Sequence, residues 1–161
     1  MASCTAPANL LTFLEQNCER MHKPRSAVLF RRGEKAFGMF LVFSGRVSLN
    51  IGIDEALARC YGAGALIGLP ATLSKRIYSM TATVIEDAEL GFLPPQVLES
   101  LMRDNPDLCQ ELLAILNERM LQIQQLQKIL LHKEKQTLWE RPGFTSQEER
   151  HVSEARRTSG E

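Results

Sequence analysis

The sequence predicts a mainly β protein with added helices: an antiparallel β-roll, double-stranded and jelly-roll-like, between a short N-terminal helix and a long C-terminal helix. Two observations carry this prediction. Residues 26–93 contain short apolar runs punctuated by glycines, which is typical of antiparallel barrels and jelly rolls. Residues 107–135 contain neither Gly nor Pro and read as one helix. Because alternating βαβ units are absent, a doubly wound parallel sheet is excluded.

The apolar runs place the expected elements along the chain. Residues 7–21 predict a short helix, which Pro24 ends. In residues 47–53, Val47, Leu49, Ile51 and Ile53 alternate with polar residues, as in a half-buried strand. Further strands are expected at residues 27–30, 39–43, 56–61, 79–85 and 90–93, with breaks at Ser44-Gly45 and Glu86-Asp87.

A short helix is expected just before Asp104, and the long helix begins at Pro106, where Asn105 is a candidate cap. About thirty helical residues span roughly 45 Å, more than the width of a small β-roll. Apolar residues recur on this helix in steps of three and four, which predicts a dimerising seam with one polar member. The seam consists of Leu112, Leu116, Arg119, Ile123, Leu126 and Leu130.

Residues 8–135 are therefore expected to form one domain, and residues 136–161 a flexible polar tail. The formal net charge is zero, which gives no reason to expect nucleic acid or membrane as a partner. No apolar run is long enough for a transmembrane helix, and four irregularly spaced cysteines fit free thiols. The expected location is the cytoplasm.

Several chemistries find no support in the sequence. The three histidines lie outside the expected strands, so a metal site on a β-roll is not expected. The cysteines are too few and too scattered for an iron–sulfur cluster or a zinc site. No nucleophile motif is present. The protein is predicted not to be an enzyme and to hold no resident metal or cofactor.

The order of elements resembles the cyclic-nucleotide-binding domain of the catabolite-activator and fumarate/nitrate-regulator superfamily over about residues 10–132. Phe30-Arg31-Arg32-Gly33-Glu34 resembles the opening strand and glycine turn. The stretch from Phe40 to Val47 resembles the hydrophobic strand with its glycine, and Asn105-Pro106-Asp107 the start of the dimerisation helix. The resemblance implies a pocket for a cyclic nucleotide, closed by the long helix.

The chain departs from this family at the phosphate cassette, which in the family reads Gly-Glu, a small turn, then Arg-Ser or Arg-Thr. Here Gly68 is retained, Leu69 stands at the Glu position, and Tyr78 followed by Ser79 stands at the Arg position. Losing both contacts costs about 3–6 kcal/mol, a weakening on the order of a hundredfold to ten-thousandfold. Lys75 or Arg76 reaching back to the phosphate is the open alternative.

The pocket implied by the resemblance is markedly apolar. We favour a filled or vestigial pocket, with an apolar ligand as the alternative. The residues expected around it are Leu66, Gly68, Leu69, Arg76, Tyr78, Ser79, Met80 and Ala82, with Met120, Ile123 and Gln124 from the long helix.

Relatives in this superfamily carry a helix-turn-helix domain after the long helix. The residues that follow His132 lack helical amphipathicity, so direct DNA binding is not expected. The main hypothesis is a homodimeric regulatory or sensor domain that binds cAMP and cGMP weakly or not at all. The alternatives are a protein-interaction module without a small ligand, and an accessory protein that forms heterodimers with a DNA-binding relative.

Overall fold

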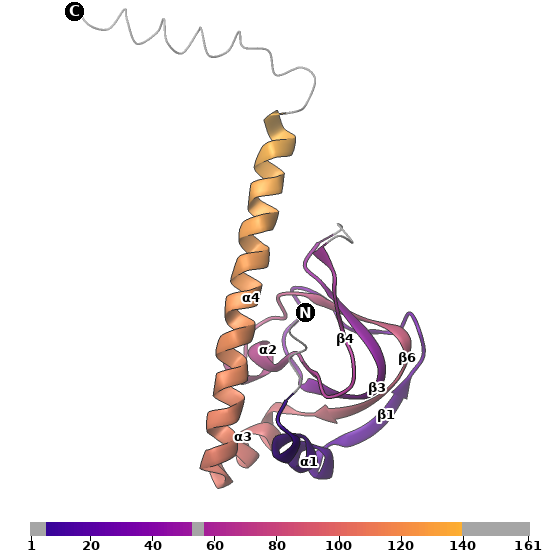
Figure 1. The fold of residues 1–161 in the computed structure, drawn as a ribbon, viewed down its shortest axis with the longest axis vertical. Helices are drawn as coiled ribbons and strands as arrows, with labels where there is room; N and C mark the ends of the chain where they lie inside the picture. Colours follow the sequence, from indigo (N-terminus) through magenta and orange to yellow (C-terminus); the bar gives the residue numbers. More distant parts are fainter. Residues whose placement is uncertain (1–5, 53–56, 140–161) are drawn as a thin grey trace, which may run out of the picture. The chain divides into compact units, whose positions relative to one another are not determined.

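The computed structural model describes residues 6–52 and 57–139, and shows the expected β-roll (Figure 1). Its antiparallel sheet has the strand order β1-β6-β3-β4, and β2 also pairs with β6 and β5 with β3. The strands are β1 (Glu19–Lys23), β2 (Val28–Phe30), β3 (Met39–Asn50), β4 (Arg59–Tyr61), β5 (Leu66–Ile67) and β6 (Thr81–Leu93). The helices are α1 (Ala8–Asn17), α2 (Leu69–Ser74), α3 (Pro95–Asp104) and α4 (Pro106–Trp139).

The two long strands β3 and β6 pair along almost their whole length, from Met39 opposite Leu93 to Asn50 opposite Thr81. The predicted breaks at Ser44-Gly45 and Glu86-Asp87 are wrong, because both strands run through them. The pairing shifts register between Val42 and Val47, so the glycine marks a bulge and not a turn. Gly45 has φ +81°, and a Cβ there would lie 2.3 Å from the Asp87 carbonyl oxygen.

The predicted helix over residues 7–21 ends early. The chain leaves α1 at Cys18, which is extended, and residues 19–23 form strand β1 against β6. Met21 is the one apolar residue of this strand, so no alternation of apolar and polar residues predicted the strand. Residues 19–23 form a strand because their backbone pairs with β6, and not because of their own side-chain pattern.

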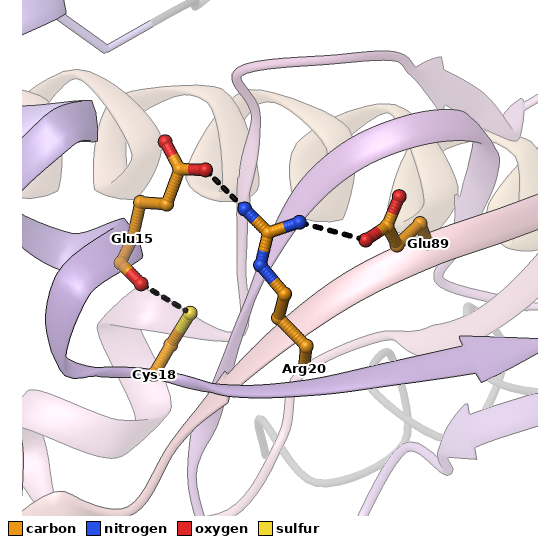
Figure 2. A network of polar contacts seen from close by, with 4 residues as sticks. All are labelled: Glu15, Cys18, Arg20 and Glu89. Carbon is orange, nitrogen blue, oxygen red and sulfur yellow. Dashed lines mark hydrogen bonds and ion pairs between the residues drawn. The ribbon is translucent and has the colours of Figure 1, made fainter.

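Arg20 of β1 contacts carboxylates of both α1 and β6 (Figure 2). Its guanidinium binds the Glu15 carboxylate of α1 and, at 2.9 Å, the Glu89 carboxylate of β6. The same group lies over the Phe43 ring, 4.5 Å from its centroid. Beside it, the Cys18 thiol donates to the Glu15 carbonyl oxygen at 3.3 Å, and burial raises the pKa of that thiol.

Two apolar cores hold the domain. The first fills the roll and includes Val47 and Leu49, which are buried as their alternation predicted; Ile53 lies outside the described residues. The second joins the outside of the roll to the helices through Leu14 of α1, Leu98 of α3 and Leu112 of α4. Full burial of such side chains stabilises by about 1.5–3 kcal/mol each.

Helix α4 begins at Pro106 as predicted and continues to Trp139, four residues beyond the predicted end. The rest of the predicted tail, residues 140–161, lies outside the described residues. The chain forms two compact units, Met1–Leu126 and Gln127–Glu161, so the roll belongs with the first part of α4. Among the described residues, no helix combines the length and apolarity needed to cross a membrane.

Replacing Gly45 by Ala tests the bulge. The side chain would occupy a left-handed backbone and meet the β6 backbone, so we expect the free energy of unfolding to fall by about 2–4 kcal/mol. The matched control is Gly62→Ala, where a Cβ meets nothing within 4 Å. Urea unfolding of the variants measures both. Equal stability of the two variants would contradict the role given to Gly45.

Candidate functional site

A cavity lies between the roll and the first part of α4, with an empty volume of about 490 Å³ that includes space open to solvent. Most of its lining is apolar or aromatic and comes from strands, from the start of α2 and from one face of α4. The lining residues are Phe30, Leu49, Tyr61, Leu66, Gly68, Pro70, Ala71, Tyr78, Ser79, Met80, Arg119, Gln122, Ile123 and Leu126.

The structure brings some of the predicted pocket residues together and leaves others out. Those that line the cavity are Leu66, Gly68, Tyr78, Ser79, Met80 and Ile123. Those that do not are Leu69, Arg76, Met120 and Gln124, and Ala82 is buried inside the roll. Each exclusion follows from the local geometry.

Neither Leu69, at the start of α2, nor Arg76, just after it, lines the cavity. Leu69 is fully buried in the second core with residues of α1, α3 and α4, and it does not line the cavity. Arg76 is exposed and does not line the cavity. Lys75 pairs with Glu99 of α3, with 2.7 Å between Nζ and Oε1. The described cassette therefore presents neither cation to the cavity.

The long helix turns a different face to the cavity than the sequence analysis assigned. Met120 and Gln124 are exposed, whereas Arg119, Gln122 and Leu126 line the cavity. Positions 119, 122, 123 and 126 share one helix face, and 120 and 124 are rotated away from it.

The predicted dimer seam is partly buried within one chain. Leu112, Arg119, Ile123 and Leu126 are buried within a single chain, Leu116 is half-buried, and Leu130 belongs to the second unit. A stripe in steps of three and four forms whether a helix packs on its own roll or on a partner. The spacing therefore revealed the stripe and not the surface that covers it.

Tyr78 closes one wall of the cavity. Its ring stacks on Phe30, with centroids 3.7 Å apart and planes 11° apart. Its hydroxyl donates to the Gly38 carbonyl oxygen at 2.6 Å and accepts from the Phe37 and Gly38 amides at 3.1 and 3.2 Å. The side chain is only 1% exposed, and burial raises the pKa of the phenol. A neutral, fixed ring thus occupies this wall.

Arg119 contributes the buried charge of the cavity. The residue is 5% exposed, and its guanidinium carbon lies 4.4 Å from the centroid of the Tyr61 ring of β4. Sequence reasoning placed it in a dimer seam, yet the signal was visible: it is the one polar member of an apolar stripe. No His, Cys, Asp and Glu within the described residues gather in a group of three that could hold a metal ion.

A family model described as "Cyclic nucleotide-binding domain" matches residues 20–105, slightly more than half of the chain. This chain belongs to that family. The match covers β1 to α3 and thus the roll and most of the cavity wall. The predicted family and the predicted fold are both confirmed.

Two relatives of this cyclic nucleotide-binding domain are parts of much longer proteins. The chain is 33% identical over 96 residues to patatin-like phospholipase domain-containing protein 7 of Mus musculus, covering 58% of this chain and 7% of that protein. It is 31% identical over 104 residues to patatin-like phospholipase domain-containing protein 6 of Homo sapiens, covering 62% of this chain and 8% of that protein. The chain thus spans less than a tenth of these relatives.

Solved structures share the fold of this cyclic nucleotide-binding domain. The catabolite activator protein of Thermus thermophilus has a TM-score of 0.63 and 23% identity, over 77% of this chain and 60% of that one. A structure titled "A cyclic-GMP-dependent signalling pathway regulates bacterial phytopathogenesis" has a TM-score of 0.67 and 22% identity, over 73% of this chain and 95% of that one. At this identity the likeness concerns the fold alone.

Replacing Tyr78 by Phe tests the phenol. At pH 7 we expect a loss of about 1–3 kcal/mol in the free energy of unfolding, because the buried Gly38 groups lose their partner. The folded pKa lies above the unfolded value of about 10, so this stabilisation is full below that pH and is lost as pH rises through the folded pKa. The gap between the variant and the wild type should therefore close at alkaline pH.

Urea unfolding between pH 7 and pH 11 measures this gap. Tyr61→Phe removes a phenol from the same cavity and serves as the control. A Tyr78→Phe variant as stable as the wild type at pH 7 would contradict the role of the hydroxyl.

Proposed function

We propose that this domain is a regulatory sensor that binds a small molecule between Phe30, Tyr78 and α4, and that it binds cAMP and cGMP weakly or not at all. It acts by binding and not by catalysis. The observation that carries the proposal is Tyr78, whose neutral ring forms the wall at the position that the family resemblance assigns to the phosphate-binding arginine.

The rest of the cassette supports this proposal. Leu69 stands where the family has the ribose-binding glutamate, and its side chain is buried in the second core. Pro70, at the start of α2, has no N–H to offer a phosphate. Lys75 is engaged by Glu99, and Arg76 is exposed outside the cavity lining. A cyclic phosphate placed as in the family would meet no cassette cation.

The similarity to short segments of long phospholipase-domain proteins supports a role as the regulatory part of a larger system. The domain would report occupancy of its cavity through α4, because that helix supplies part of the cavity wall. The thiols of Cys18, Cys60 and Cys109 are free, which supports the cytoplasm as its location.

We also propose that the domain forms a homodimer through α4, using a different face from the predicted seam. Leu113 and Met120 lie two turns apart on the same face and are 43% and 42% exposed, and Leu121 beside them is 61% exposed. Residues seven apart on a helix lie on the same side, so this exposed apolar surface can pack against the same surface of a second copy. The resemblance to a family with a dimerisation helix here supports the same partner.

Calorimetric titration of cAMP and cGMP tests the ligand proposal. We expect no heat of binding up to millimolar nucleotide, because the cassette offers the phosphate no cation. Arg76→Ala is the control, and its titration should match that of the wild type. Micromolar binding that disappears in Arg76→Ala would mean that the cassette is rebuilt around Arg76, and would overturn the proposal.

Replacing Leu113 and Met120 together by Glu tests the dimer. We expect monomers in sedimentation with little change in the melting temperature, because both side chains are exposed in one chain. Gln125→Glu adds a charge on another side of the same helix and should leave the dimer intact. A dimer that survives the double substitution would exclude this face. Charging Ile123, within the predicted seam, should unfold the domain instead.

A further inference from the structure

Arg119 lines the cavity and is 5% exposed. Its guanidinium carbon lies over the Tyr61 ring, 4.4 Å from the centroid. Its Nε and Nη2 atoms are buried and have no hydrogen-bond partner among the described residues. These two atoms form one edge of the guanidinium, and their parallel N–H bonds match two oxygens of a carboxylate or a phosphate.

A buried cation without a counter-charge is costly, because arginine remains protonated at any ordinary pH and cannot shed its charge. An aromatic face offsets part of this cost but satisfies no N–H group. Arg119 is also the one cationic side chain in the cavity lining of the described residues. A bound anion would satisfy both the charge and the unpaired N–H edge.

The remaining lining restricts the rest of the ligand. Phe30 and Tyr78 offer stacked rings, and Leu66, Met80 and Leu126 offer apolar surface. A strongly hydrated inorganic anion would gain nothing from these walls. An anion joined to an apolar or aromatic body would bury both parts favourably.

We propose that the cavity binds an organic anion, a carboxylate or phosphate on an apolar body, whose charged group is held by the Nε–Nη2 edge of Arg119. This inference rests on the proposed sensor function and deepens it. The anion anchor moves from the cassette to α4, so binding would act directly on the helix proposed to dimerise. The charged group of the ligand would therefore lie at α4, whereas the family resemblance places the phosphate at the cassette.

The test uses the full chain and two substitutions. Arg119→Met removes the charge and keeps most of the side-chain length. Arg103→Met removes an exposed arginine of α3 and is the matched control. The probes are sodium decanoate and 1-naphthyl phosphate, each with its uncharged counterpart, decan-1-ol or 1-naphthol. Thermal unfolding is followed with and without each probe, and calorimetry gives the affinity.

Without ligand, Arg119→Met should raise the melting temperature by about 3 °C or more, because a buried unpaired charge is replaced by an apolar side chain. At least one anionic probe should stabilise the wild type and the Arg103→Met control, and bind at least tenfold more tightly than its uncharged counterpart. That preference should disappear in Arg119→Met. Decanoate and naphthyl phosphate distinguish an aliphatic carboxylate from an aromatic phosphate as the better occupant.

Three results would each overturn the proposal: a lower melting temperature of ligand-free Arg119→Met, anion binding that persists in that variant, or no stabilisation of the wild type by either anion. The first would show that Arg119 is a structural partner of Tyr61. These outcomes are independent of the cAMP titration. Nucleotide binding that depends on Arg76 would overturn the proposal that the domain binds cAMP and cGMP weakly or not at all. It would not change the results expected for Arg119→Met.

Discussion

The pairing of β3 with β6 is the constraint on which the rest of the structure depends. These strands form the middle of the sheet and give β1, β2, β4 and β5 their partners. The bulges between Val42 and Val47 add local twist and bend, which turns a long flat ribbon into a roll with an inside. The cavity follows from that curvature, because its strand residues Phe30 and Leu49 belong to the apolar core inside the roll.

Tyr78 and Arg119 line the cavity from two different parts of the chain, the loop before β6 and helix α4. Tyr78 is hydrogen-bonded to the backbone of Gly38, so that part of the site is held by buried hydrogen bonds. Arg119 comes from α4, where Ile123 and Leu126 are buried and the guanidinium lies over the Tyr61 ring of β4. A ligand of the proposed kind would therefore contact the roll and the helix together.

Much of the fold was predictable because its signals are local. Alternation at Val47 and Leu49 identified a buried strand face, and the absence of Gly and Pro identified α4. The failures share one cause, which is that a one-dimensional pattern does not say what an element meets. Gly45 carried the signal of a turn and forms a bulge, because Asp87 lies against it. The cavity residues were half predicted: the resemblance located Tyr78, whereas the face of α4 was fixed only by contact with the roll.

The order in which the strands pair has a consequence for how the chain is made. β1 and β2 both take their partner from β6, and the outermost pair of the roll joins Met39 to Leu93. Contacts this distant in sequence form slowly, and during synthesis the N-terminal strands emerge long before the strand that completes them. Until β6 is made, the sheet edges of the nascent roll have no partner in their own chain, which makes pairing with another chain the main hazard of that interval.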